Sequence, residues 1–240
     1  MRFPALPLLE VPLGLLDPPL GFPWWPQGNK AALRLAAKGL VHAAAVCLRG
    51  PSGGRRTGPG APSVRRGTRV IAFCSWREGL VLRPEQAAGI AGVADLHRAG
   101  LGVVNREPGP EARRILDKEL ADQGTDPRQL SGYETRAAGH LQVAAAIAAG
   151  LADAEVASEP AALAYGLAFV PLTSEWVDLV IPAAAVESRE VRGLLKVLSS
   201  RCLIDQLASL PGYDVSDCGE RVPSLVLGHR DPPGSCGCPW

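Results

Sequence analysis

The stretch VVNREPGPEARRIL, residues 103–116, carries residue types that could bind an anion. Two valines lead into Asn105 and Arg106, and a Pro-Gly-Pro turn at 108–110 precedes a helical pattern. The free N–H groups and partial positive charge of a helix start can hold an oxyanion. An arginine at the end of the strand would add a fork of parallel donors. We therefore expect Arg106 to supply charge and Asn105 to supply a hydrogen bond at an anion site.

The helix after this turn offers further donors and one obstacle. Arg113 lies in its first turn and could face the same site, and the amides of Glu111 and Ala112 could donate to the anion. Pro110 removes one donor but is well tolerated at the first helical position. The Glu111 carboxylate would repel an anionic ligand. On these residues alone, a glutamate-capped helix with surface arginines is as good an interpretation as an anion site.

Residues suited to catalysis are present, but their spacing matches no familiar motif. The sequence has neither an HExxH nor a Walker lysine motif, and Cys74 and Ser75 have no basic partner close by. Glu78 could be a general base, but a single carboxylate is usually solvated. His140 stands at the start of an Ala-rich pattern, where it either enters the helix or faces the cleft as a ligand donor. We therefore expect a protein that is not an enzyme.

The six cysteines, at positions 47, 74, 202, 218, 236 and 238, form no CxxC pair. A chain of 240 residues is long enough to fold without disulfides, so we expect reduced thiols in a cytoplasmic protein. The pair Cys236 and Cys238 lacks further ligands close by. We expect neither a metal site nor a cofactor.

Charge and hydropathy limit the possible partners. The net charge is +1, so no overall field favours nucleic acid. Arginines at 55, 56, 65, 66 and 69 lie in or beside a Gly/Pro-rich stretch, residues 49–67, without interleaved aromatics. This setting favours a solvated loop over direct nucleic-acid binding. No window approaches the ~20 apolar residues of a membrane span, and prolines and acids interrupt the apolar leader.

Helical and strand-like periodicities alternate over residues 28–222, which predicts an α/β fold with mostly parallel sheets. A Pro-rich leader, residues 1–27, and a Pro/Gly/Cys tail, residues 223–240, are expected to be poorly ordered. The predicted helices are 29–40, 90–100, 111–124, 140–150, 160–165, 188–200 and 202–210; the predicted strand segments are 41–48, 69–76, 79–84, 101–106, 153–157, 167–172 and 176–182.

The order of these segments resembles the periplasmic-binding-protein-like domain family over about residues 28–222. Phrases such as VVNRxxG, AAAIAAGLADA, GLAFVPL and DLVIP occur in the family's order. Relatives are the ligand-binding parts of helix-turn-helix regulators and of some molybdenum-cofactor biosynthesis proteins. They are similar in plan to exported binding proteins for molybdate and tungstate.

The resemblance implies a type II fold, in which two α/β lobes are joined by two crossover strands and the ligand lies between them. Lobe 1 would be residues 28–103 plus 176–222, and lobe 2 would be residues 104–175. The crossovers would be the strand into Asn105-Arg106 and the FVPL strand, residues 169–172. The family's first strand and helix are not recognisable before Gly28, so lobe 1 could be incomplete.

The chain departs from the family pattern at the expected site. The family's turn after Asn-Arg resembles Gly-Ser-Gly-Thr-Arg, whereas residues 109–113 read Gly-Pro-Glu-Ala-Arg and lack both hydroxyl donors. The family's glycine-serine turn in lobe 1 corresponds to Gly28-Asn29, and Glu155 stands where glycine is usual. Missing donors cost about 1–3 kcal/mol each at a buried site. Either the ligand differs from a simple oxyanion or the site has decayed.

The leading hypothesis is a non-catalytic sensor or carrier for a small anion, with molybdate, tungstate or a molybdenum-cofactor precursor as the ligand that the resemblance suggests. The alternative is a regulatory or assembly module with a degenerate ligand site. Its partner would be a separately encoded DNA-binding or biosynthetic protein. The candidate ligand-binding residues are Gly28, Asn29, Asn105, Arg106, Glu111, Ala112, Arg113 and His140.

Overall fold

The computed structural model describes residues 5–48, 63–64, 67–223 and 225–226. Most of the arginine-rich loop and of the C-terminal tail lies outside the described residues. The helices are η1 (Leu6–Leu9), α1 (Glu10–Gly14), α2 (Asn29–Ala37), η2 (Pro84–Gln86), α3 (Val93–Arg98), α4 (Glu111–Asp122), η3 (Pro127–Gln129), α5 (His140–Ala148), α6 (Glu159–Ala164), η4 (Ala183–Ala185), α7 (Arg189–Leu198) and α8 (Arg201–Ala208). The strands are β1 (Ala44–Leu48), β2 (Ser63–Val64), β3 (Arg69–Leu82), β4 (Asn105–Arg106), β5 (Arg136–Ala137), β6 (Ala154–Ser158), β7 (Ala168–Ile181), β8 (Tyr213–Asp214) and β9 (Leu225–Val226).

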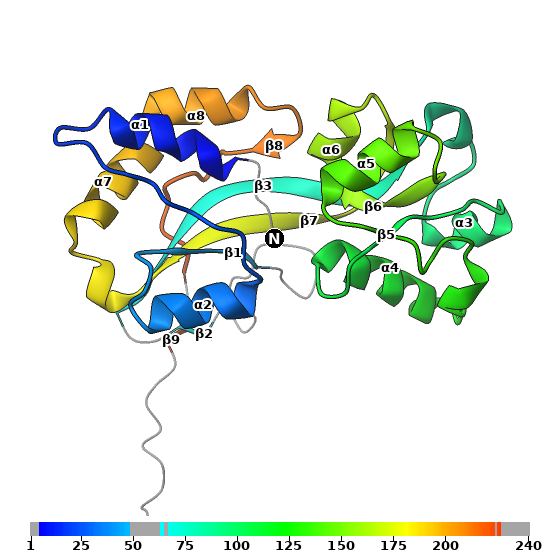
Figure 1. Cartoon of the computed structure of the whole chain (residues 1–240), viewed down its shortest axis with the longest axis horizontal. Coiled ribbons are helices and arrows are strands. Elements are labelled where there is room, and N and C mark those ends of the chain that lie inside the picture. Colours follow the sequence, from blue (N-terminus) through cyan, green and yellow to red (C-terminus); the bar gives the residue numbers. More distant parts are fainter. Residues whose placement is uncertain (1–4, 49–62, 65–66, 224, 227–240) are drawn as a thin grey trace, which may run out of the picture.

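Two long strands, β3 and β7, run side by side through both halves of the molecule (Figure 1). They form the centre of a sheet in the order β1-β7-β3-β6, with β8 also paired to β3. The first lobe contains β1, β8, the start of β3 and the end of β7. The second lobe contains β6 and the opposite ends of both long strands. The predicted α/β fold with two lobes and two crossover strands is confirmed.

The direction of strand pairing differs from the sequence prediction. Every pairing within the main sheet is antiparallel. Among the described residues, parallel pairing is limited to β2–β9, β4–β5 and a bridge between Val103 and Ala154. Mostly parallel sheets were expected because strands and helices alternate along the chain. That expectation was wrong because the two longest strands cross between the lobes in opposite directions.

One of the two expected crossovers was misplaced. The FVPL segment does lie in a crossover, β7, but the other crossover is β3 and not the strand into Asn105-Arg106. Residues 80–103 consequently belong to the second lobe, where Leu80, Leu82 and Val103 share one core with α3 and α4. Each crossover was predicted as two short segments, 69–76 with 79–84 and 167–172 with 176–182. The expected lobe boundary at residue 103 was therefore too late in the chain.

Helices cover both faces of the sheet in each lobe, and alternate residues of β3 contact opposite faces. In the first lobe Ile71 and Phe73 face the core under α1, α7 and α8, whereas Val70 and Ala72 face the core shared with α2. In the second lobe Leu80 faces α3 and α4, and the neighbouring Val81 of β3 faces α5 and α6. This alternation follows from the two-residue period of a strand.

The N-terminal leader is part of the first-lobe core, so the prediction of poor order over residues 1–27 was wrong for the described part. Leu6, Leu9 and Leu13 are buried against the same core as Phe73. Their spacing of three and four residues gives η1 and α1 one continuous apolar face. The Arg189 guanidinium further along the chain donates to the carbonyl oxygens of Pro18 and Pro19, at 2.8 and 3.2 Å.

Gly79 of β3 lies opposite Pro171 of β7, beside an irregularity in the pairing of the two strands. A Cβ added at Gly79 would lie 2.1 Å from the carbonyl oxygen of Val170. We expect Gly79→Ala to lower the free energy of unfolding by about 1–3 kcal/mol, because the strands would have to separate. Urea denaturation measures this, with Gly14→Ala as the control, since nothing lies within 4 Å of a Cβ there. Unchanged stability of Gly79→Ala would contradict such close pairing.

Candidate functional site

Buried polar side chains gather where the two crossover strands pass from one lobe to the other. Glu78 of β3 and Glu175 of β7 are 0% and 1% exposed, and Arg106 of β4 is 3% exposed. His140 begins α5, and its ring lies with these residues. One side-chain atom from each of Glu78, His140 and Glu175 lies within 4.8 Å of the others. We call Glu78, Arg106, His140 and Glu175 the junction cluster.

The Arg106 guanidinium forms two hydrogen bonds with the carboxylate of Glu107, its neighbour in the sequence. Its Nε and Nη2 donate to the two carboxylate oxygens of Glu107, each at 3.0 Å. The hydrogen bonds from Arg106 lower the pKa of Glu107. The Glu107 side chain is 44% exposed, whereas the Arg106 side chain is 3% exposed. An exposed carboxylate therefore occupies the donors that an anionic ligand would use.

His140 is held as a neutral imidazole. Its Nδ1 accepts a hydrogen bond from the backbone N–H of Ser158 at 3.2 Å, so the ring proton is on Nε2. Nε2 lies 3.6 Å from Oε1 of Glu78. Burial lowers the pKa of His140, and the nearby Arg106 guanidinium, with Nη1 3.5 Å from both ring nitrogens, lowers it further.

The carboxyl groups of Glu78 and Glu175 lie side by side between the lobes. Burial raises the pKa of Glu78 to about 8, and the Glu175 carboxyl group, which hydrogen-bonds to it, adds to this effect. Oε1 of Glu78 accepts a hydrogen bond from the Trp76 indole at 2.9 Å. At neutral pH Glu78 is therefore mostly protonated and can donate a hydrogen bond.

The junction cluster does not suit a metal ion, although it combines a histidine with two carboxyl groups. A histidine ligand needs a free lone pair on the coordinating nitrogen. In His140 one nitrogen accepts from Ser158 and the other carries the proton toward Glu78. The cluster is therefore better described as a set of buried hydrogen-bonding side chains that includes Arg106.

Of the two candidate residues of the first lobe, Gly28 and Asn29, only Asn29 contacts β1. Gly28 is exposed at the start of α2. The Asn29 side chain donates to the carbonyl oxygen of Cys47 at 2.7 Å and accepts from its N–H at 3.1 Å. The Cys47 thiol in turn hydrogen-bonds the Glu175 carboxyl group, and burial raises the pKa of that thiol well above its usual value. The candidate residues of both lobes thus connect through the crossover strands.

The other candidates of the second lobe hold Arg106 in place. The Asn105 side chain accepts from the Arg106 N–H at 2.8 Å and donates to the Tyr133 carbonyl oxygen at 3.2 Å. Arg113 donates to the Arg106 carbonyl oxygen at 3.0 Å, and its guanidinium lies over the Tyr133 ring. Ala112 is buried in the second-lobe core. The polar groups of Asn105 and Arg113 therefore form hydrogen bonds within the protein.

Glu111 turns its carboxylate toward a residue of its own helix. Its Oε2 lies 3.3 Å from Nη1 of Arg114, one turn further along α4. Of the eight candidate residues, only Arg106 and His140 therefore belong to the junction cluster. Sequence reasoning missed Glu107 and Glu175, and it treated Glu78 only as a possible base. The one available signal for Glu175 was an acid within the apolar pattern that continues as WVDLVIP.

The family model described as "PBP superfamily domain" matches residues 15–199. The chain belongs to this family. The PBP domain is 29% identical over 167 residues to the uncharacterized protein YvgK of Bacillus subtilis (strain 168). The aligned region covers 68% of this chain and 54% of YvgK. The chain thus spans about half the length of that relative.

Solved structures show the same PBP fold at low identity. A putative phosphate ABC transporter substrate-binding protein with bound phosphate, from Clostridium perfringens, matches with a TM-score of 0.58 and 12% identity over 85% of this chain and 92% of that chain. The regulatory domain of MetR, a LysR family regulator from N. meningitidis, matches with a TM-score of 0.54 and 11% identity over 88% of this chain and 93% of that chain. Within the described part of the PBP domain, no helix has the length and hydropathy to cross a bilayer.

The Cys74 thiol of this PBP domain is unsuited to act as a nucleophile. Cys74 of β3 is buried, and burial raises the pKa of its thiol well above the usual value. A nucleophilic cysteine needs the opposite shift, toward the thiolate. Cys74 is therefore not activated for covalent chemistry.

Proposed function

We propose that this PBP domain binds a small anion between its lobes and acts as a non-catalytic sensor or carrier. The observation that carries the proposal is the buried Arg106 fork, which the half-exposed Glu107 carboxylate occupies at the lobe junction. A ligand can take both donors when Glu107 turns toward solvent. Two parallel N–H donors match a carboxylate or a tetrahedral oxyanion. The crossover strands β3 and β7 would allow the lobes to close around it.

The donors around Arg106 favour a tetrahedral oxyanion, with molybdate and tungstate as the proposed ligands. His140 beside Arg106 is neutral and Glu78 next to His140 is mostly protonated, so neither adds negative charge near the fork. The phosphate bound to the similar Clostridium perfringens protein supports this ligand class. A phosphorylated molybdenum-cofactor precursor would present the same chemistry.

The second candidate function is a regulatory or assembly module with a degenerate ligand site. It is favoured because the Glu107 carboxylate already accepts hydrogen bonds from two donors of Arg106. The similarity in fold to the MetR regulatory domain supports a sensor that acts through a separately encoded DNA-binding or biosynthetic partner. The described cysteines, at 47, 74, 202 and 218, form no disulfide, which supports a cytoplasmic location.

A thermal-shift experiment with molybdate, tungstate, sulfate and phosphate tests the proposed function. We expect at least one anion to raise the melting temperature of the wild type, because a ligand at 100 times its Kd stabilises the fold by ~2.7 kcal/mol. Arg106→Ala should abolish this rise, and Arg106→Lys should weaken it, because lysine keeps the charge but loses the fork. The control is Arg114→Ala, whose side chain is 68% exposed.

Two outcomes would count against anion binding at Arg106. An undiminished rise in Arg106→Lys would show that the anion binds elsewhere. No rise with any of the four anions in the folded wild type would favour the degenerate module.

A further inference from the structure

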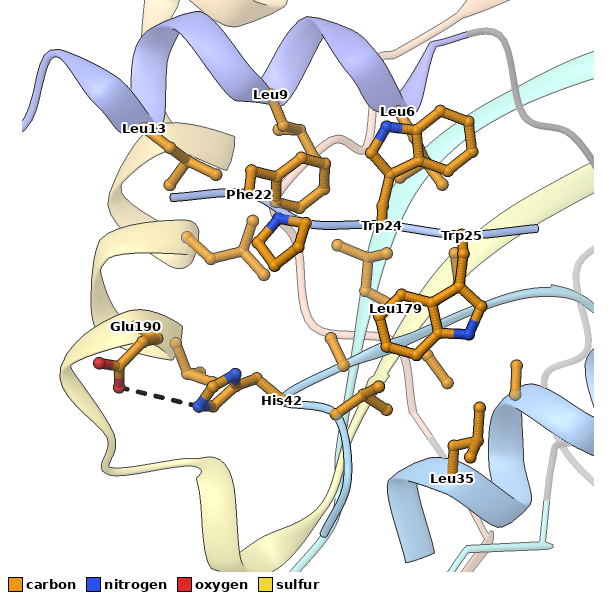
Figure 2. Close-up of a pocket in the computed structure, with 18 of the residues that line it drawn as sticks. Leu6, Leu9, Leu13, Phe22, Trp24, Trp25, Leu35, His42, Leu179 and Glu190 are labelled. Carbon is orange, nitrogen blue, oxygen red and sulfur yellow. Dashed lines mark ion pairs between the residues drawn. The ribbon is translucent and has the colours of Figure 1, made fainter. Parts of the chain in front are cut away.

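A cavity lies in the first lobe, away from the junction cluster. Its volume is about 430 Å³, within the range of small-molecule sites. One wall is the extended segment 20–27, and the others come from η1, α1, α2, β1 and α7. Figure 2 shows this segment crossing the cavity, with Phe22 near Leu9 and Trp24 near Leu6.

The segment 20–27 is anchored at its start and held away from α2. The Arg189 guanidinium binds the carbonyl oxygens of Pro18 and Pro19 just before it. Leu20 packs against Gly193 of α7 so closely that a Cβ there would lie 2.3 Å from the leucine side chain. On the opposite wall, α2 presents the small side chain of Ala32 beside Leu35.

Polar groups gather at one edge of this otherwise apolar cavity. His42 and Glu190 lie there as a pair, with Nε2 and Oε2 3.9 Å apart (Figure 2). Their side chains are 60% and 48% exposed, so this edge opens to solvent. Glu190 is in the first turn of α7, and its own backbone N–H lowers the pKa of its carboxyl group. The edge therefore carries a negative charge near neutral pH.

We propose that this cavity binds a small aromatic molecule that carries a basic amine. The aromatic part would enter among Trp25, Leu35 and Leu179, which line the cavity away from Glu190 (Figure 2). The amine would lie at the edge and pair with the Glu190 carboxylate. The negative charge of Glu190 favours an amine over a carboxylate ligand at this edge. This site shares no residue with the junction cluster and does not depend on anion binding there.

Three probes with one skeleton and different head groups test the proposal: 4-phenylbutylamine, 4-phenylbutanol and 4-phenylbutyrate. Binding is followed by the fluorescence of the tryptophans, excited where the phenyl group does not absorb. The amine should bind roughly two- to fivefold more tightly than the alcohol, as for a partly exposed ion pair, and the butyrate should bind least. Glu190→Gln should make the amine and the alcohol bind equally.

Ala32→Leu should prevent binding of all three probes by filling the cavity, and its melting temperature shows whether it folds. Trp25 is half exposed, and Trp25→Ala should weaken binding of the amine probe. It is the second variant if Ala32→Leu does not fold. Arg106→Lys should bind the amine like the wild type, which separates this site from the proposed anion site. The proposal is overturned if the folded wild type binds no probe or if the three probes bind equally. It is also overturned if neither Ala32→Leu nor Trp25→Ala lowers the affinity for the amine probe.

Discussion

The free energy of unfolding falls by several kcal/mol as the pH is raised from about 5 to about 8, because two fully buried carboxyl groups keep their protons in the folded protein and lose them on unfolding. Burial raises the pKa of Glu78 and of Glu155 from 4.5 to about 8. In the unfolded chain both groups are ionised above about 4.5. Between about 4.5 and about 8 the folded state therefore binds more protons than the unfolded chain, so stability falls as the pH rises and levels off above about 8. The slope is about 1.4 kcal/mol per pH unit for each group.

Urea denaturation across this pH range measures the effect. Glu78→Gln and Glu155→Gln should each make the pH dependence shallower, because a buried amide of the same shape does not titrate. Glu134→Gln is the control, since the Glu134 side chain is 74% exposed. If neither buried substitution changes the slope, the two glutamates are not protonated in the folded state.

Leu9→Ala should lower the free energy of unfolding by about 2–5 kcal/mol, although it changes a Pro-rich segment at the start of the chain. Leu9 is 0% exposed and packs in the first-lobe core with Phe73 and Leu203. Removing its side chain leaves a cavity that the surrounding sheet and helices cannot close.

Leu15→Ala is the matched control, because Leu15 lies just beyond α1 and is 80% exposed. It should change stability by less than about 0.5 kcal/mol. Urea denaturation at one pH compares the two variants. Equal, small effects would show that the N-terminal segment does not belong to the folded core.

Helical periodicity was the part of the sequence that predicted the fold best. In α4 the helical spacing of Ala112, Ile115, Leu116 and Leu120 predicts one apolar face, and the structure buries these four residues. Gly124, just after the helix, has a φ of 66°. The crossover strands were harder to recognise. Pro171 interrupts the pattern of β7, and it is tolerated because it lies opposite Gly79 beside an irregularity in the β3–β7 pairing. Such a local accommodation is invisible in one sequence.

The candidate site was only partly predictable, because its character depends on contacts between distant residues. The spacing around Arg106 pointed to an arginine at a strand end, but the burial of Arg106 depends on α4 and α5. Glu107 looked like an ordinary surface acid, and its role follows only from the two hydrogen bonds that it accepts from Arg106. Glu175 meets Glu78 only because β3 and β7 pair.

Isothermal titration of Glu107→Gln with molybdate, tungstate, sulfate and phosphate tests most directly whether an anion replaces the Glu107 carboxylate on Arg106. Glutamine removes the internal competitor and leaves the arginine fork in place. The variant should bind its preferred anion roughly fivefold more tightly than the wild type, or ~1 kcal/mol, and Arg106→Lys should bind it more weakly. Equal affinity of Glu107→Gln, Arg106→Lys and the wild type would contradict anion binding at this fork.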